Sequence, residues 1–227
     1  MGARLAIELA SLGANLSLHA RKIEHLETTK TACQKFGHGV DVFAANLEYP
    51  EKVQAMIQGL RATGLDIIYN NAASPSLHIE HYLIPANDFE LCFKINALAP
   101  ILLANAFIPD MQARGFGRVI NISTELQHHP ASAAYACSKA ALDKFVADLA
   151  PTLAGTGVNI NLVNPGSLRT DMNPRGEQAV ESAVNGLLLA ALLEQGNGRW
   201  ISAQDYSGLP LQEAYSEAIS RLETTTT

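Results

Sequence analysis

Short apolar runs alternate with longer amphipathic patterns along the chain, and this alternation restricts the possible folds more than any other feature. Most of the runs are continuously apolar, as expected for strands that helices cover on both faces. Strands are predicted at 15–20, 40–45, 65–70, 117–123, 158–163 and 199–203. Helices are predicted at 2–12, 23–36, 50–63, 88–113, 131–154, 177–194 and 210–222. The sequence therefore predicts an α/β fold, in which a doubly wound parallel sheet carries helices on both faces.

Composition limits the classes of function. A chain of 227 residues, 48% hydrophobic and 17% charged, is expected to form a single domain over 1–227. A net charge of −6 without a cluster of Lys and Arg argues against nucleic acid as a partner. The apolar stretch GLLLAALL is far shorter than the roughly 20 residues of a membrane span, so no membrane association is expected.

The cysteines and the first residues bear on the cellular compartment. Cys33, Cys92 and Cys137 do not have the spacing of metal ligands, so no metal site is predicted. Their odd number favours reduced thiols in a cytoplasmic protein. The opening residues already form an amphipathic helical pattern, so no signal peptide is expected.

The segment YACSK places Tyr135 and Lys139 four residues apart in a predicted helix, so both side chains share one face. Tyrosine has an ordinary pKa of about 10, and a neighbouring ammonium group lowers it because it stabilises the phenolate. Such a pair can transfer protons near neutral pH. A chance surface pair has the same spacing, so the surrounding motifs must decide between the two interpretations.

Polar residues stand where predicted strands end, which is where doubly wound sheets bind their ligands. These residues are Asn70, Asn71, Ser123, Thr124 and, after a Pro-Gly turn, Thr170. Asn96 lies inside a predicted helix. A mid-helix Asn in apolar surroundings indicates an internal hydrogen bond or a bound water.

Together and in this order, these segments resemble the short-chain dehydrogenase/reductase family over essentially the whole chain. The resemblance implies a Rossmann-type domain that binds NAD(H) or NADP(H) and moves hydride between nicotinamide C4 and a carbonyl or alcohol carbon. It also implies catalytic roles. Tyr135 would be the general acid/base, Lys139 would lower its pKa and hold the nicotinamide ribose, and Asn96 would anchor a relay water.

The resemblance further implies a set of cofactor contacts. Segment 70–73 matches the family's NNAG segment beside the cofactor, and 165–170 matches the segment at the nicotinamide end. A segment after the strand at 40–45 would contact the adenine, with an Asn where the family often has Asp. The residues implied are Asn46, Leu47, Asn70, Asn71, Ala72, Ala73, Pro165, Gly166 and Thr170, besides Tyr135 and Lys139.

Two departures from the family pattern affect the site. The substrate-orienting serine is usually the second residue of a Ser-Ser pair, which aligns Thr124 with that role and Ser123 beside it. The segment from there to Tyr135 is about two residues shorter than the common spacing, so the choice between Ser123 and Thr124 stays open, with Thr124 favoured. The other departure is Ala73 in place of the usual Gly, which adds a methyl group where the backbone approaches the cofactor.

The end of the strand at 15–20 bears on the choice of cofactor. Enzymes that prefer NAD place a carboxylate there, and that carboxylate would repel a 2′-phosphate. Here the position is Ala20, followed by Arg21 and Lys22. A guanidinium can pair bidentately with phosphate, so NADP(H) is favoured over NAD(H). The alternative is that these are two surface cations at the start of a helix.

The opening MGARLAIELASLGA resembles the helix that follows the family's TGxxxGxG turn, with Gly2 as the last glycine. The first strand and the two earlier glycines have no counterpart, which predicts unpaired backbone groups between the neighbours of that strand. We expect this chain to be an incomplete version or a remnant of a longer protein. Two functions follow: an NADP(H)-dependent oxidoreductase, or a catalytically silent relative that binds or oligomerises.

The substrate and the assembly are also predicted. After Thr170 the chain passes almost directly into the next helix, so the lid is short and the pocket open to uncharged carbonyl compounds or secondary alcohols. The candidate walls are Tyr82, Leu126, His128, His129 and Met172. For His128 and His129, two solvent-exposed loop histidines are the favoured interpretation. The helices at 88–113 and 131–154 carry small and apolar residues on more than one face, which favours a homodimer or homotetramer.

Overall fold

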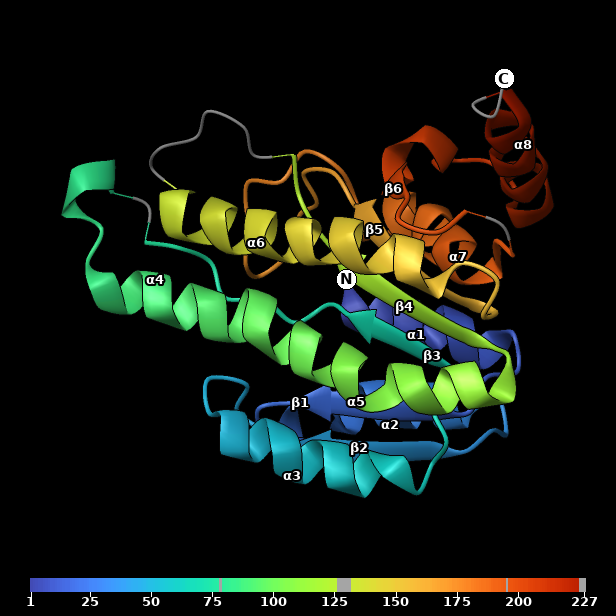
Figure 1. Ribbon diagram of the computed structural model, residues 1–227, viewed down its shortest axis with the longest axis horizontal. Helices are drawn as coiled ribbons and strands as arrows, with labels where there is room; N and C mark the ends of the chain where they lie inside the picture. The colour runs from blue at the N-terminus through green and yellow to red at the C-terminus, as the bar shows by residue number, and fades with distance from the viewer. Residues whose placement is uncertain (78, 126–131, 195, 225–227) are drawn as a thin grey trace.

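The structure is a computed structural model that describes residues 1–77, 79–125, 132–194 and 196–224 (Figure 1). Its strands agree with the predicted ranges to within two residues. They are β1 (Leu16–Ala20), β2 (Val40–Ala44), β3 (Ile67–Asn70), β4 (Gly117–Ile122), β5 (Val158–Asn164) and β6 (Trp200–Ser202). Every strand pair is parallel, as the alternation of apolar runs and helices predicts.

The strands form two sheets. β1 pairs with β2 in one sheet, and the other has the order β3-β4-β5-β6. The sequence predicted unpaired backbone groups between the two neighbours of the strand without a counterpart, and the division falls there, between β1 and β3. Within the described residues, no strand bridges β1 and β3. The fold is nevertheless Rossmann-like, with parallel strands and helices on both faces.

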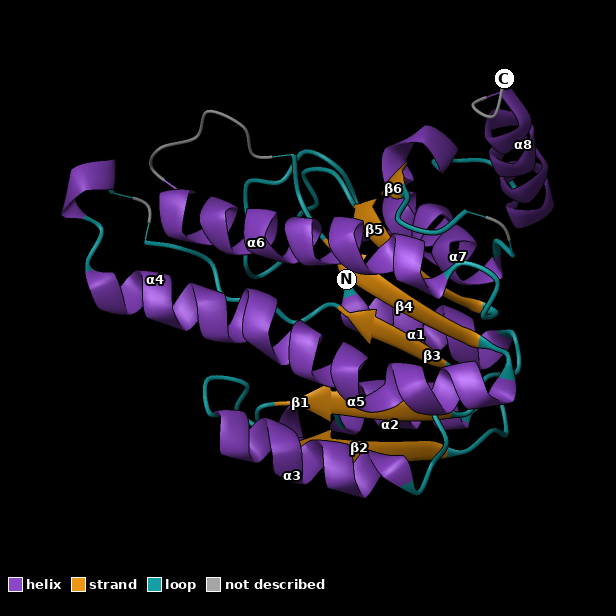
Figure 2. Cartoon of the chain, viewed as in Figure 1, coloured by secondary structure: helices purple, strands orange, loops and turns teal. Residues whose placement is uncertain are grey.

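Helices cover both faces of the sheets (Figure 2). In this view α3, α5 and α6 lie in front of the strands and α1 lies behind them, as the packing of the two main cores requires. The helices are α1 (Gly2–Ser11), α2 (Glu27–Gln34), α3 (Pro50–Arg61), α4 (Ala86–Phe93), α5 (Ala99–Arg114), α6 (Ala133–Leu149), α7 (Val184–Leu192) and α8 (Leu211–Thr224).

The side chains of β4 show how the two cores are built. Val119 packs into the core with α3, α5 and α6, while Ile120 and Ile122 pack into the core with α1, α7 and α8. All six residues of this strand are buried, because successive side chains point to opposite faces and helices cover both. β4 is therefore packed on both faces, and the candidate site lies at its carboxyl end.

Several predicted helices are not continuous α-helices. The predicted helices at 23–36 and 177–194 begin with 3₁₀ turns, at Ile23–His25 and Val180–Ala183, before α2 and α7. The range 88–113 contains α4 and α5, joined by a π-helical turn at Lys94–Leu98 that includes Asn96. Within the described residues, the combined segment Ala86–Arg114 is the one helix with the length and hydropathy to cross a membrane. Core helices pass the same test, and this one packs against α3, α6 and β4.

Candidate active site at the carboxyl ends of the strands

The predicted proton-transfer pair lies at the start of α6. Tyr135 is half-buried in the first turn, and Lys139 follows one turn later with only 2% of its surface exposed. The Lys139 ammonium group lies 5.7 Å from the centre of the Tyr135 ring and donates a hydrogen bond of 2.6 Å to the Ile122 carbonyl oxygen. The two side chains therefore share one face of the helix, as their spacing predicted, and Lys139 contacts the end of β4.

Burial controls the pKa values of this pair. It raises the pKa of Tyr135 to about 12, with smaller contributions in the same direction from Cys92 and Asp143. It lowers the pKa of Lys139 to about 8, against an opposing effect of Asp143. The expected lowering of the Tyr135 pKa is therefore wrong for this arrangement. The cause is the loss of solvent around the phenol, while the Lys139 ammonium binds the Ile122 carbonyl.

Ser123 and Thr124 follow β4, and the structure separates them. Ser123 is 1% exposed, and its hydroxyl donates a hydrogen bond of 2.5 Å to the Asp143 carboxylate. Thr124 is partly exposed. Asp143 was missed in the sequence, although its position four residues after Lys139 in a predicted helix was a signal that could have identified it.

Asn96 is fully buried in the π-helical turn, and its amide group is held by several partners. Its Oδ1 accepts a hydrogen bond from the Ser74 amide at 2.7 Å. Its Nδ2 donates to the Ser74 carbonyl and to the Ser138 hydroxyl, each at 2.9 Å. The predicted internal hydrogen bonds are therefore present. They connect the turn to the segment after β3 and to α6, and a π-helical turn frequently marks a functional site.

The segment after β3 approaches the first helix. Asn70 is buried and donates a hydrogen bond of 2.8 Å to Asn121 on β4, whose own Nδ2 is buried and has no hydrogen-bond partner among the described residues. The Asn71 side chain lies so close to Gly2 that a Cβ atom there would be 2.7 Å from its Nδ2. Ala73 is partly buried and Ala72 is exposed. The structure thus brings the predicted contacts of Gly2 and 70–73 together.

The predicted adenosine contacts lie at the ends of β1 and β2. Arg21 and Lys22 are exposed beyond β1. Asn46 Oδ1 accepts a hydrogen bond of 3.1 Å from the Glu48 amide. Leu47 is 8% exposed and packs in the core with α3 and α5, so its side chain is not available for the predicted ligand contact. An apolar side chain after β2 is drawn into this core, which leaves only its backbone for that role.

The segment after β5 doubles back on itself. Pro165 accepts a hydrogen bond of 2.7 Å from the Gln204 side chain, a contact not identified in the sequence. Gly166 has a φ of 80°, and a Cβ atom there would lie 2.7 Å from Gln204 Cγ. The Thr170 amide and carbonyl both bond to Asn173. A 3₁₀ turn at Val180–Ala183 leads into α7, so the helix predicted from residue 177 begins later, and the short lid stays a prediction.

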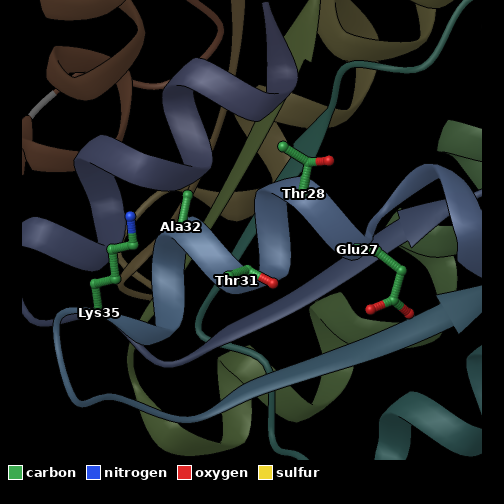
Figure 3. A pocket seen from close by; sticks show the side chains of 5 residues that line it. All are labelled: Glu27, Thr28, Thr31, Ala32 and Lys35. Carbon is green, nitrogen blue, oxygen red and sulfur yellow. The ribbon is translucent and has the colours of Figure 1, made fainter.

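The predicted walls are only partly described. Tyr82 and Met172 are exposed, at 72% and 44% of their surfaces. Leu126, His128 and His129 lie outside the described residues. An open hollow of about 430 Å³ lies elsewhere, along α2, and Figure 3 shows the side chains that line it: Glu27, Thr28, Thr31, Ala32 and Lys35. None of these five is a predicted site residue.

Comparison with known proteins decides the family. Residues 1–181 match the family model for short chain dehydrogenases. This chain belongs to that family. Two relatives of the short-chain dehydrogenase are Nodulation protein G of Rhizobium sp. (strain N33), 29% identical over 81% of this chain and 77% of the relative, and Nodulation protein G of Rhizobium meliloti (strain 1021), 30% identical over 77% and 71%.

Solved structures give the same result for this short-chain dehydrogenase. A metagenomic short-chain oxidoreductase in complex with NADP has a TM-score of 0.78 and 29% identity, and the match covers 88% of this chain and 90% of that one. The promiscuous reductase LugOII has a TM-score of 0.78 and 27% identity over 90% of both chains. The family relationship supports an oxidoreductase that uses a nicotinamide cofactor.

Proposed function

We propose that this chain transfers hydride between NADP(H) and a carbonyl compound or secondary alcohol, with Tyr135 as the general acid/base. The observation that carries the proposal is the convergence of Tyr135, Lys139 and Asn96 at the end of β4. Tyr135 and Lys139 share one face of α6, and Asn96 is bonded to Ser138 on the same helix. Parallel α/β sheets bind ligands at this edge of their strands.

The residues around this edge fit a dinucleotide. Gly2 stands at the start of α1, where a side chain would clash with Asn71 and where the first amide groups of the helix favour an anion. Arg21 supplies a guanidinium beyond β1, which suits a 2′-phosphate better than a ribose hydroxyl. A similar structure with NADP bound, at 29% identity, supports NADP(H) over NAD(H).

The cofactor supplies the hydride when it is bound, and the chain supplies the proton. Tyr135, with its pKa near 12, keeps its phenolic proton at neutral pH and can donate it to a carbonyl oxygen that becomes an alcohol. Lys139 is charged below about pH 8, so its ammonium can hold a ribose hydroxyl of the cofactor. Thr124 would donate a hydrogen bond to the same carbonyl oxygen.

The substrate proposed is a neutral carbonyl compound of modest size. The segment after Thr170 closes on itself through Asn173 and leads into the helix that follows, which leaves a short wall beside the site. Binding energy for discrimination comes from walls that contact the substrate and exclude water, so a short wall predicts broad acceptance.

The test is consumption of NADPH in the presence of a panel of ketones and aldehydes, with and without carboxylate or phosphate groups. We expect several neutral members to be reduced, and NADH to support a lower rate. Strong preference for one anionic compound, with neutral members inert, would contradict the substrate class. No consumption with any member, at protein concentrations that bind NADPH, would contradict the reaction.

A catalytically silent relative is the second candidate, and the division of the sheet favours it. A bound cofactor would have to reach from Arg21, at the end of β1, to Lys139, beside the four-stranded sheet. Its two ends would therefore contact two sheets that do not pair with each other in the described part of the chain. Titration of the chain with NADPH distinguishes the two candidates. Binding followed by turnover supports the oxidoreductase, whereas absence of binding supports the silent role.

A homodimer or homotetramer in the cytoplasm is part of the proposal. Phe93 and Leu98 are 39% and 38% exposed near the junction of α4 and α5, which adds apolar surface to the predicted interface. All three cysteines are free, which suits a reducing compartment. Light scattering at micromolar concentration should give at least twice the mass of one chain, and a monomer would contradict the assembly.

A further inference from the structure

Two side chains of α6 hold the end of β4. Lys139 donates a hydrogen bond of 2.6 Å to the carbonyl oxygen of Ile122, and Asp143 accepts one of 2.5 Å from the hydroxyl of Ser123. Lys139 and Asp143 are four residues apart, so they lie on the same face of the helix. One helical turn therefore fixes two consecutive residues at the point where the strand enters the loop of the candidate site.

The bond to Asp143 limits what Ser123 can do. A serine hydroxyl has one proton to donate, and Ser123 gives it to the carboxylate. The residue is also only 1% exposed, so a substrate cannot reach the hydroxyl without breaking this contact. Thr124 is the next residue and is partly exposed, which leaves its hydroxyl as the donor available to a carbonyl oxygen.

We propose that Asp143 is a positioning residue: it withdraws the Ser123 hydroxyl from the substrate and keeps the buried ammonium group of Lys139 charged. The inference deepens the proposed function and rests on the roles given there to Tyr135 and Lys139. Asp143 itself touches neither substrate nor cofactor. It acts through Ser123 on one side and through Lys139 on the other.

The charges around the site agree with this role. Burial lowers the pKa of Lys139 to about 8, and Asp143 is the charged group that opposes this effect. The pKa of Asp143 is itself raised, because burial outweighs the opposing effects of its bond to Ser123 and of Lys139. The other titratable groups near the pair are Tyr135 on α6 and Cys92 on α4, whose pKa values are both raised. Asp143 thus acts on the pKa of Lys139 in the direction that favours the ammonium form.

The first test removes the charge of Asp143 and retains an oxygen that can accept the Ser123 hydrogen bond. In Asp143→Asn, Lys139 should lose its proton at lower pH, so the alkaline fall of kcat/KM for carbonyl reduction should move down by about half a pH unit or more. Asp143→Glu should restore most of the original profile. Asp148→Asn is the matched control, because Asp148 is an exposed partner of Lys144 on the same helix, and it should leave the profile unchanged. An unmoved profile in Asp143→Asn would overturn the inference.

The second test does not depend on turnover. Lysine labelled with ¹³C at Cε reports its own protonation by NMR, and the Lys139 signal can be assigned through Lys139→Met. We expect its titration to shift to lower pH in Asp143→Asn. A shift in a chain that reduces no carbonyl would refute the proposed function and retain the inference, whereas turnover without a shift would refute the inference alone.

A third comparison tests whether Ser123 or Thr124 donates the hydrogen bond to the substrate. It replaces the first test if circular dichroism shows that Asp143→Asn does not fold. Thr124→Ala should lower kcat by about 10-fold to 100-fold, as expected for loss of one hydrogen bond to the reacting oxygen. Ser123→Ala should cost clearly less, because that hydroxyl already bonds to Asp143. An equal or larger loss in Ser123→Ala would show that Ser123 meets the substrate.

Discussion

The two sheets of this molecule are supported very differently. In the four-stranded sheet, every residue of β4 is buried, and large side chains from α3, α5, α6 and α7 close both faces. In the two-stranded sheet, the residues of β1 are only half-buried. In the cluster with α1 and α2, the buried residues are Ala6, Ala10 and Cys33, which are all small, while Phe43 of β2 packs partly buried into the core with α3. Small side chains bury little apolar area, so the contact with α1 and α2 contributes less stability.

This difference separates the proton-transfer groups from one end of the cofactor. Tyr135, Lys139 and Asn96 lie on or against the firmly packed sheet, whereas Arg21 lies beyond β1 in the weaker one. Chemistry needs atoms held within fractions of an ångström, while attraction of a phosphate tolerates more motion. The candidate reaction therefore depends on the rigid part, and cofactor choice depends on the part that is less supported.

The largest effect should follow from a change in the rigid part. Tyr135→Phe should reduce turnover on the order of 10³-fold, because the phenolic proton is lost and general acid/base groups contribute about 10²-fold to 10⁴-fold. NADPH binding and circular dichroism should stay close to those of the unmodified chain. Comparable turnover by the Phe variant would show that the proton comes from elsewhere.

Hydrogen exchange compares the two sheets directly. Amide groups of β1 and β2 should exchange at least about 100-fold faster than those of β4 and β5, since local opening costs less where few apolar contacts break. Amide exchange followed by NMR gives both sets in one sample. Saturating NADPH should narrow the difference, because the proposed ligand contacts both parts. Equal protection of the two sheets in the free chain would show that the two-stranded sheet is as stable as the four-stranded one.

The strands were predictable because each is a continuous apolar run bounded by turns. The π-helical turn at Lys94–Leu98, which joins α4 and α5, could not be predicted, because its sequence keeps an apolar helical pattern and only its backbone hydrogen bonds differ. The division of the sheet was predictable, because the strand that would pair with both β1 and β3 has no counterpart in the sequence.

The site was predicted unevenly for a related reason. Tyr135, Lys139 and Asn96 carry a recognisable motif, and the structure brings them to one edge. Asn121 bonds to Asn70, which is far away in the sequence, and no spacing marks such a contact. Asp143 lies one turn after Lys139, which spacing could have indicated, but its bond to Ser123 could not be predicted in this way. The direction of the Tyr135 pKa shift depends on burial, which the spacing of Tyr and Lys does not reveal.

A change in the weaker part should alter cofactor choice and leave the chemistry intact. Arg21→Glu should weaken NADPH binding by about 10-fold or more and NADH binding by less than about 2-fold, because a carboxylate repels the 2′-phosphate. Lys35→Glu is the control, since Lys35 is an exposed cation at the far end of α2. Equal losses for both cofactors in Arg21→Glu would show that Arg21 does not meet the phosphate.

The smallest effect concerns the cost of burying Lys139 in the rigid part. Its pKa is near 8 in the folded chain, against an ordinary value of 10.5, so the unfolded chain binds more protons between these limits. Because of Lys139, the free energy of unfolding should increase as the pH rises from about 8 to 10.5. Below about pH 8 this contribution should no longer change with pH. Other groups, such as Cys92 with its raised pKa, titrate in the same range, so the variants must be compared by difference.

Urea unfolding at several pH values between 7.5 and 10 measures this difference. Lys139→Met should be stabilised relative to the unmodified chain near pH 7.5, by an amount on the order of 1–3 kcal/mol that shrinks as the pH rises. Lys144→Met, which removes an exposed lysine of the same helix, should follow the unmodified chain at every pH. A constant difference between Lys139→Met and the unmodified chain would mean that Lys139 titrates normally. Burial of the Lys139 ammonium group would then not lower the free energy of unfolding.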